Sequence, residues 1–299
     1  MKTFDFQQLS TGDIYQLMIG VIAPRPIAFV SSISENGIPN LAPYSYFNAF
    51  SSDPPIVVFS SNLQAADPHK KDTLRNAEAT REVVINMVNY DIVRQMAISS
   101  IAFDAEVSEF EKAGLTPIAS EVVRPFRVKE SPVQMECSVQ QILPLGTAAG
   151  AGNLVVCEIL KLHIDETILD EKGRINPHRI DLMGRMGRTY YVRSSGEAIH
   201  SIYQSRQQLT IGFDALPNSA KLSTVLTGND LAQLAGLEVA PHRAELLKLQ
   251  DDKLAQSLLQ SETPRHALHL RAKKLLASEQ VEQAAQFVWL ADQLEASGL

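Results

Sequence analysis

The sequence predicts a mainly β fold with some helices, an antiparallel barrel that is followed by an α-helical C-terminal extension. Short segments with alternating apolar residues recur between residues 26 and 165, and turn-forming residues separate them. Twelve of the 15 prolines precede residue 200, whereas the remainder is rich in Ala, Leu, Gln and Glu with helical spacing. We therefore expect two domains, residues 1–199 and 200–299.

The expected strands begin with residues 26–33. The Asn36–Gly37 pair that follows is typical of a tight hairpin turn, so a returning strand is expected over 38–47. After a Pro-Pro corner, the further expected strands are 55–61, 82–89, 133–145 and 154–165.

The expected helices differ in number between the two domains. In the first domain four helices flank or plug the barrel, at 12–20, 71–80, 91–99 and 104–115. Thr263 and Pro264 together form a helix start signal, because a threonine hydroxyl caps free amides and proline tolerates the first helical position. The helices expected in the second domain are 229–237, 242–260, 264–277 and 279–296.

The charge pattern favours a small-molecule partner. The net charge of −7 is spread along the chain without long runs of one sign, which argues against nucleic acid or an anionic membrane as the main partner. No window resembles a signal peptide or reaches the roughly 18 apolar residues of a membrane span, so we expect a cytoplasmic protein. Cys137 and Cys157 lie in separate strands and are expected to be reduced, buried thiols.

Residues 23–55 are rich in proline, serine and asparagine. Prolines restrict the backbone, and the hydroxyl and amide groups between them can hold a planar polar ligand. The sequence Lys70-Lys71-Asp72-Thr73 begins an expected helix, and a helix N-terminus with nearby lysines favours a phosphate. The alternative is that both features are structural, as turn residues of a barrel and a solvated helix start.

Other side chains show no clear site. The loop "GTAAGAG" (146–152) joins two strands instead of opening a helix, so it is not a dinucleotide-binding fingerprint. His163 and His178 are expected to be structural. We expect His266 and His269 at the surface, because no third ligand with matching spacing accompanies them, and we predict no metal site.

The order of several motifs is more specific. The segments "APRPIAFVSS", "NLAPYSYFN", "KDTLRN", "FEKAGLTPI", "ESPVQMECSV" and "LVVCEILKLHID" resemble the flavin reductase-like, FMN-binding split-barrel family over residues 10–192. The resemblance implies a Greek-key split β-barrel that forms a homodimer and binds FMN at the interface, with FAD as the less favoured flavin.

The resemblance also implies the residues of a flavin site. It matches the first flavin-contacting strand to Arg25, Ser31 and Ser32, and the segment lining the isoalloxazine to Asn40, Leu41, Ala42, Ser45, Tyr46 and Phe47. The family's "KDT" element, expected at the phosphate, corresponds to Lys71, Asp72 and Thr73, with capping of the helix as the alternative role of Asp72.

A later segment, residues 175–191, resembles one that approaches the flavin in the family. It gives Gly187 and Tyr190 as candidates, although the family often has a pair of small residues where this chain has Gly187–Arg188. Arg185 and Arg188 are interpreted either as contacts for the phosphates of a dinucleotide or as solvated side chains.

The implied activity is that of an NAD(P)H-dependent flavin oxidoreductase, in which hydride passes from nicotinamide to flavin N5. Such a transfer needs positioning rather than an acid or base, so no catalytic side chain is assigned. The alternative is a flavin-binding electron carrier or sensor. The helical C-terminal region lies outside the resemblance. We expect it to extend the dimer contact or to cover the mouth of the flavin site, or alternatively to dock a protein electron acceptor such as a monooxygenase.

Overall fold

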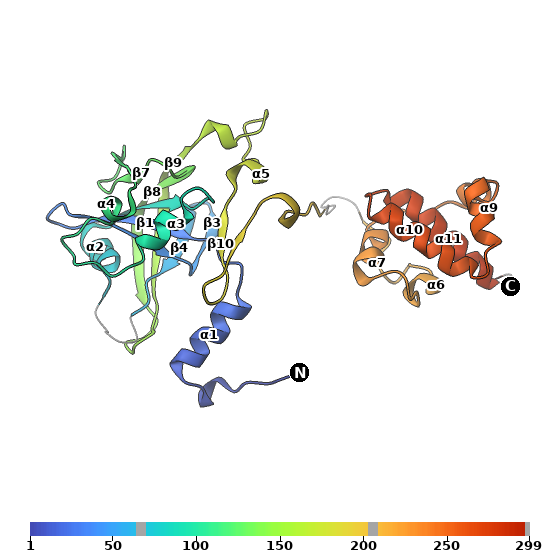
Figure 1. Ribbon diagram of the computed structural model, residues 1–299, viewed down its shortest axis with the longest axis horizontal. Helices are drawn as coiled ribbons and strands as arrows, with labels where there is room; N and C mark the ends of the chain where they lie inside the picture. Colours follow the sequence, from blue (N-terminus) through green and yellow to red (C-terminus); the bar gives the residue numbers. More distant parts are fainter. Residues whose placement is uncertain (64–69, 203–208, 297–299) are drawn as a thin grey trace. The chain divides into compact units, whose positions relative to one another are not determined.

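A computed structural model describes residues 1–63, 70–202 and 209–296. By its internal contacts the chain divides into two units, Met1–His200 and Ser201–Leu299 (Figure 1). No helix among these residues is long and apolar enough to cross a membrane.

The first unit is built on a seven-stranded antiparallel sheet in the order β2-β1-β5-β8-β9-β4-β3. Its strands are β1 (Ala28–Ile33), β2 (Pro39–Tyr44), β3 (Phe47–Ser52), β4 (Pro55–Ser60), β5 (Glu82–Met87), β8 (Val133–Pro144) and β9 (Asn153–Ile164). Smaller two-stranded ribbons are formed by β6 (Pro117–Ile118) with β7 (Arg127–Val128) and by β10 (Met183–Arg185) with β11 (Tyr191–Arg193).

The first hairpin follows the sequence signal. β1 and β2 pair from Ala28↔Tyr44 to Ile33↔Pro39, and the Gly37 N–H closes the turn on the Ser34 carbonyl at 3.0 Å. Gly37 has φ of 84°, a left-handed conformation that glycine adopts without steric cost.

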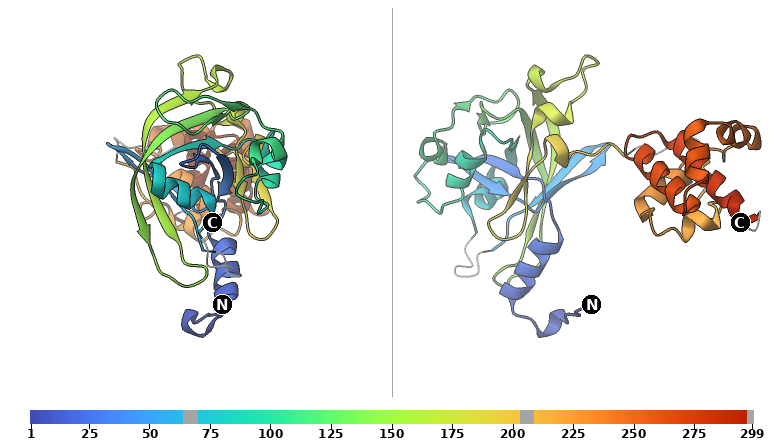
Figure 2. Two further views of the ribbon diagram at one scale, coloured as in Figure 1. Left: turned by 90° about the vertical axis from the view of Figure 1, so that its left-hand side faces the viewer. Right: turned by 45° about the vertical axis from the view of Figure 1, so that its right-hand side comes forward.

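The sheet closes into a barrel because its two outermost strands are neighbours in sequence. Only Ser45 and Tyr46 separate β2 from β3, so the two edges must meet. Across this junction, which we call the seam, the rings of Tyr44 and Phe59 have centroids 5.1 Å apart, and Ser60 N–H donates to the Tyr46 carbonyl at 2.8 Å. Figure 2 shows the curled sheet with β8 and β9 wrapping around its core.

One expected strand was wrong at its end, and one strand was not predicted. The strand expected over 38–47 ends at Tyr44, and Phe47–Ser52 form a separate strand, β3, before the Pro-Pro corner. β3 is exposed on both faces after Phe47, so it carries none of the alternation that marks a half-buried strand.

Helices pack around the sheet of the first unit. They are α1 (Thr11–Val21), α2 (Asp72–Thr80), α3 (Val93–Ile98), α4 (Glu109–Ala113) and α5 (Pro177–Ile180), with 3-10 turns at Phe6–Gln8, Glu166–Ile168 and Gly196–Ala198. The helix expected over 104–115 is therefore only the five residues of α4. Leu74 and Ala77 of α2 pack into the core with Val30 and Ile85 of the sheet.

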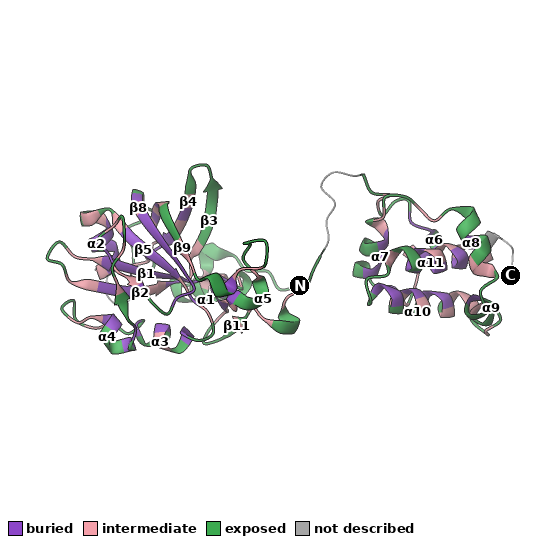
Figure 3. Cartoon of the chain, turned by 90° about the horizontal axis from the view of Figure 1, so that it is seen from above, coloured by how far each residue is buried: buried purple, intermediate pink, exposed green. Residues whose placement is uncertain are grey.

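The second unit consists of helices around its own core. They are α6 (Asn218–Lys221), α7 (Gly228–Ala235), α8 (Arg243–Gln250), α9 (Lys253–Leu259), α10 (Pro264–Leu276) and α11 (Val281–Ala296). The helix expected over 242–260 is broken, because the Asp252 carboxylate accepts the amides of Leu254 and Ala255 and so starts α9. Buried residues run along α10 and α11 in Figure 3.

His269 corrects another expectation. It is 2% exposed instead of lying at the surface, and its Nδ1 lies 2.9 Å from Ser223 Oγ. It occupies a position among Leu268 and Ala272, both fully buried, on the face of α10 that packs into the core.

The two cysteine thiols, Cys137 and Cys157, are free and buried as expected. Burial raises the pKa of Cys157 to about 12.

Candidate functional site

A buried polar cluster lies where α2 begins. Ser32 of β1 and Asn40 of β2 are paired in register. Asn40 Nδ2 donates to Ser32 Oγ at 3.2 Å and to Thr73 Oγ1 at 2.8 Å, and Asn76 Nδ2 donates to Ser32 Oγ at 3.1 Å. The structure thus brings together three predicted residues, Ser32, Asn40 and Thr73. Asn76 was missed, although its place one helical turn after Thr73 would have indicated it.

The first turn of α2 offers unpaired donors. Lys71 is the N-cap residue, and no side chain caps the helix. Within the described ranges, the N–H groups of Asp72 and Thr73 have no acceptor. Because the Thr73 hydroxyl accepts from Asn40, its own proton remains available to donate. A helix N-terminus of this kind attracts an anion through both its amides and its dipole.

Two buried hydroxyls beside Lys71 and Thr73 also lack partners among the residues the structure describes, Tyr44 OH and Ser61 Oγ. Lys71 Nζ lies 5.4 Å from the centroid of the Tyr44 ring. Burial raises the pKa of Tyr44, and the nearby Thr73 and Ser61 hydroxyls oppose that rise. Lys71 as a whole is exposed, so a ligand can reach it, and partial loss of hydration lowers its pKa. Orphaned hydroxyls, a cation and free amides form a donor set that fits a phosphate.

Asp72 does not have the capping role given as its alternative. It is the first residue of α2 rather than its N-cap, and its carboxylate forms an ion pair with Arg75 one turn further on. The ion pair compensates the negative charge of Asp72 with the guanidinium of Arg75 in the same helix.

Arg25 joins three segments on the other side of the seam. It is 5% exposed, and its Nη1 donates to the carbonyls of Ile19 (2.7 Å) and Ile22 (2.5 Å) at the end of α1. Its Nη2 donates to the Met186 carbonyl at 3.2 Å, and Nε to Ser45 Oγ at 3.4 Å. Burial lowers the pKa of Arg25. Arg25 therefore positions Ser45 and the segment after β10, and most of its donors are already used.

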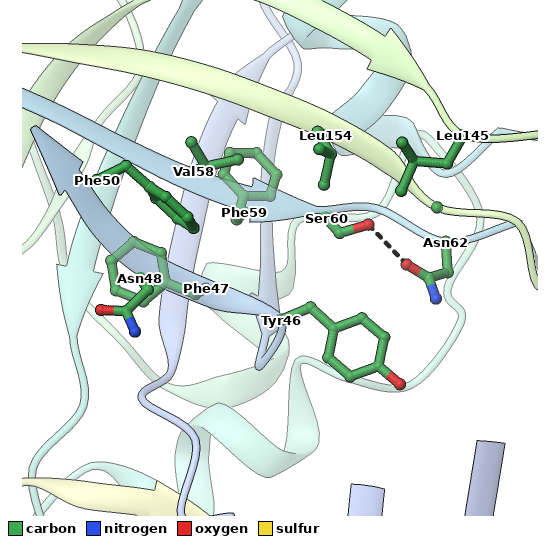
Figure 4. A pocket seen from close by; sticks show the side chains of 11 residues that line it. Tyr46, Phe47, Asn48, Phe50, Val58, Phe59, Ser60, Asn62, Leu145 and Leu154 are labelled. Carbon is green, nitrogen blue, oxygen red and sulfur yellow. Dashed lines mark hydrogen bonds between the residues drawn. The ribbon is translucent and has the colours of Figure 1, made fainter. Parts of the chain in front are cut away.

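Tyr46 and Phe47 line a cavity of about 390 Å³ at the seam. Figure 4 shows Tyr46, Phe47 and Phe50 on one side of it and Leu145 and Leu154 on the other. Its polar groups include Ser60 Oγ and Asn62 Oδ1, which are 2.8 Å apart. An apolar cavity with a few polar groups suits an aromatic ring system.

Three further predicted residues lie on opposite faces of the β1–β2 hairpin, with Ala42 on one face and Leu41 and Ser31 on the other. Ala42 lies on the face of Tyr44 and Ser32. Leu41 packs in a different core cluster with Phe29, so the side chains of Leu41 and its partner Ser31 point away from that face. At this edge of the sheet the Leu41 N–H donates to Glu109 Oε2 at 3.0 Å.

Glu109 is a residue that sequence reasoning missed. Its carboxylate is buried beside α2 and the edge of β2. Burial raises the pKa of Glu109, the bond from Leu41 opposes the rise, and the charge of Asp72 adds to it. Nothing in its local sequence separates it from the other acidic residues of 104–115.

Gly187 and Tyr190 line a second cavity, of about 570 Å³, between α1 and the turn after β10. A Cβ at position 187 would lie 3.2 Å from Gly20 Cα, so glycine allows the turn to pack against α1. The structure therefore places these two candidates near Arg25 through Met186, and away from the cluster at the start of α2.

His163 has a structural partner, as expected. Its Nε2 lies 2.7 Å from Oε1 of Glu136. Glu136 is fully buried and accepts the N–H groups of Glu121, Val122 and Val123. This carboxylate ties a loop to the sheet.

Comparison with known proteins agrees with this geometry. The model of the family described as flavin reductase like domain matches residues 22–188. An uncharacterized protein from Aquifex aeolicus is 39% identical over 184 residues, which cover 62% of this chain and 91% of that protein.

Two solved structures share the fold of the first unit. Nitrilotriacetate monooxygenase component B from Bacillus cereus is 31% identical with a TM-score of 0.62, covering 69% of this chain and 98% of that one. Pseudomonas fluorescens 2-nitrobenzoate 2-nitroreductase is 28% identical with a TM-score of 0.61, covering 70% and 99%. The match spans more than half of the chain and includes both sides of the seam, so the protein belongs to the flavin reductase like family of split-barrel flavoproteins.

Proposed function

We propose that the protein binds FMN in the unit Met1–His200 and acts as an NAD(P)H-dependent flavin oxidoreductase. The observation that carries the proposal is the donor set at the position where α2 begins. It comprises Lys71, whose Nζ lies 5.4 Å from the centroid of the Tyr44 ring, the N–H groups of Asp72 and Thr73, and the buried Tyr44 and Ser61 hydroxyls, and neither these amides nor these hydroxyls have a partner among the described residues. In this assignment that position holds the FMN phosphate, which favours FMN over a flavin without a terminal phosphate.

In this proposal the other residues of the site hold and orient the phosphate and the ring system of FMN. Thr73 and Tyr44 donate to the phosphate end, while Asn40 keeps the Thr73 hydroxyl oriented by its 2.8 Å bond. Arg25 fixes the Ser45–Tyr46 link at the seam through its contacts to Ser45, α1 and Met186. The apolar cavity beside Tyr46 and Phe47 excludes water from a ring held there.

When bound, FMN supplies the redox chemistry, because a hydride from C4 of NAD(P)H is accepted at its N5, which oxidises the nicotinamide and reduces the flavin. None of the residues above has to donate or remove a proton for that transfer. Their contribution is geometric and electrostatic.

We expect the working form to be a homodimer in the cytoplasm, where NAD(P)H is available. Large apolar side chains beside the cavity at the seam are exposed, including Phe50 (68%) and Leu145 (60%), and such side chains support a subunit contact. Similarity to a monooxygenase component B favours a protein or a flavin-using partner as the electron acceptor. Sedimentation analysis tests the dimer directly.

The first test compares two adjacent lysines. Lys71→Ala removes the proposed counter-charge, and we expect the Kd for FMN to rise roughly 10- to 100-fold, the loss of a charge-assisted hydrogen bond. Lys70→Ala is the control, because Lys70 pairs with Glu78 at 2.6 Å. Riboflavin, which has no phosphate, should bind the wild type and Lys71→Ala alike. If FMN binds both variants as it binds the wild type, the phosphate assignment is wrong.

A second measurement separates enzyme from electron carrier. NADH or NADPH is added anaerobically to the FMN-loaded protein, and flavin absorbance is followed. Bleaching supports the oxidoreductase. A flavin that stays oxidised with both nucleotides but is reduced by dithionite identifies a carrier or sensor, and a protein that remains colourless with excess FMN contradicts flavin binding.

A further inference from the structure

The cavity between α1 and the turn after β10 is lined by a cation that has no partner among the described residues. Its walls include Leu17 and Gly20 of α1 and Met186, Gly187, Arg188 and Tyr190 of the turn, and it encloses about 570 Å³. That volume suits a ligand of the size of a nucleotide or larger. None of the lining residues is acidic.

Arg188 differs from the other arginines around it. Arg185 stacks on Tyr191 at 4.5 Å, and Arg193 forms an ion pair with Asp181 at 2.7 Å. Arg188 is exposed, and no hydrogen bond or ion pair joins it to any residue within the described parts of the chain. An arginine held in a cavity wall without an internal partner is available to an external anion.

The backbone of Arg188 is held by a hydrogen-bonded turn. Its φ is 55°, in the left-handed region that favours glycine or asparagine. The turn is held by Met186 N–H to the Tyr190 carbonyl (3.0 Å) and Tyr190 N–H to the Gly187 carbonyl (3.2 Å). These two bonds fix the turn that carries Arg188 at the cavity wall.

The end of α1 is tied to Arg25. The last carbonyls of a helix carry partial negative charge, and two carbonyls at this end, those of Ile19 and Ile22, are bonded to Arg25. The same guanidinium bonds to the carbonyl of Met186, a cavity wall residue, and to Ser45 at the seam. The cavity is therefore connected through one side chain to the predicted isoalloxazine-lining segment.

We propose that this cavity binds the diphosphate-bearing part of a pyridine dinucleotide, with Arg188 contacting a phosphate and the exposed Tyr190 ring receiving a planar group. The inference rests on the proposed function, since it gives the second substrate of the same site its own binding surface. The cluster at the start of α2 holds the flavin phosphate separately, so the two anions do not compete.

The test is a steady-state comparison at saturating FMN. Arg188→Asn removes the charge and suits the left-handed backbone, and we expect it to raise KM for NADH or NADPH roughly tenfold, as loss of a charge-assisted contact would. The kcat and the Kd for FMN should stay within about twofold, and the salt dependence of kcat/KM should weaken. Arg188→Lys should recover part of the loss.

The matched control is Arg81→Asn. Arg81 also has a left-handed φ, of 58°, but it ends α2 and does not line the cavity. It should leave KM unchanged. Equal KM values for the wild type and Arg188→Asn would overturn the proposal, as would an equal rise in Arg81→Asn, which would show a general effect of removing positive charge.

A binding measurement distinguishes failure of this inference from failure of the proposed function. Dithionite-reduced, FMN-loaded protein cannot accept a hydride, and it is titrated anaerobically with NADH and NADPH in a calorimeter. Saturable binding that weakens in Arg188→Asn supports the cavity even if the oxidised protein is not bleached by either nucleotide. Binding of equal strength in both proteins, or no binding to the wild type at millimolar nucleotide, contradicts it.

Discussion

At the scale of single residues, Glu109 is a buried carboxylate that holds the backbone of β2 beside the candidate phosphate site. Its Oε2 holds the Leu41 N–H at the free edge of β2, next to Asn40, which orients Thr73. Because no strand of the described residues pairs with β2 at Leu41 on this side, the bond to Glu109 replaces a ladder hydrogen bond that the sheet lacks there.

Glu109 also predicts a pH effect on stability. Its folded pKa is raised by burial, so it favours the folded state below the pKa of the unfolded chain, and that contribution is lost as the pH rises through the folded pKa. Glu109→Gln keeps an acceptor for Leu41 without a charge. We expect its free energy of unfolding to equal or exceed that of the wild type at pH 7, with the advantage disappearing near pH 4, as urea denaturation would show.

Glu109→Ala supplies the contrast, because it leaves the Leu41 N–H unpaired at a cost of about 1–3 kcal/mol. If Gln and Ala destabilise the protein equally at pH 7, the carboxylate acts by packing and the bond to Leu41 is unimportant.

At the scale of elements, Glu136 on β8 secures the loop that carries β6 and β7. Burial alone would raise the pKa of Glu136, but the N–H groups of residues 121–123 and the His163 ring together lower it. Three consecutive amides converging on one carboxylate form a small anion nest, here filled from within the chain.

Removing that carboxylate should release the loop. Glu136→Ala leaves the amides of Glu121, Val122 and Val123 without their acceptor, and we expect a loss of about 3–5 kcal/mol in unfolding free energy with faster hydrogen exchange at those three amides. Glu158→Ala on the neighbouring β9 is the control, since Glu158 bonds only to the Gln140 side chain among the described contacts. Unchanged exchange at residues 121–123 in Glu136→Ala would contradict this account.

At the scale of the whole molecule, the two units have separate cores. The core cluster of the second unit joins helices α6 to α11, and the single tryptophan of the sequence, Trp289, packs against it. The clusters of the first unit contain no residue beyond Met183 among those described. Tryptophan fluorescence therefore reports the second unit, while flavin absorbance would report the first.

This separation makes the pH response of the second unit measurable in the full chain. Burial, with the nearby charges of Arg265 and His266, lowers the pKa of His269 to about 4. A histidine buried in its neutral form stabilises the fold above its unfolded pKa of about 6.5, and the contribution falls as the pH drops toward the folded value.

We expect the second unit to lose up to about 3 kcal/mol between pH 6.5 and 4 through this residue, following 1.36 kcal/mol per pKa unit. Thermal unfolding followed by Trp289 fluorescence measures it, and His269→Gln should flatten the dependence while the signal of the first unit is unaffected. An identical pH dependence in His269→Gln would show that other groups control it.

Local features of the fold were predictable from the sequence. The Asn36–Gly37 turn, the alternation of β1 and the start of α2 at Lys71–Asp72 each depend on neighbouring residues alone, and each is observed. The site residues contributed by these elements, Ser32, Asn40 and Thr73, were therefore predictable together once a family pattern linked them. β3 was not, because its residues are exposed on both faces and carry no pattern.

The sequence by itself determined most of the strand-forming and helix-forming segments, the place of the first hairpin and, through the family resemblance, the candidate phosphate position, since backbone propensity and side-chain periodicity are local properties. Only the tertiary structure decided which distant groups meet. Arg25 bonds to Met186, 161 positions away, Glu109 reaches Leu41, and His269 turns into a core. Such contacts depend on the order of the strands in the sheet and on the closure of the barrel. A polar group is buried or paired only in the folded chain, so its contribution to the free energy of folding cannot be assigned from neighbouring residues in the sequence.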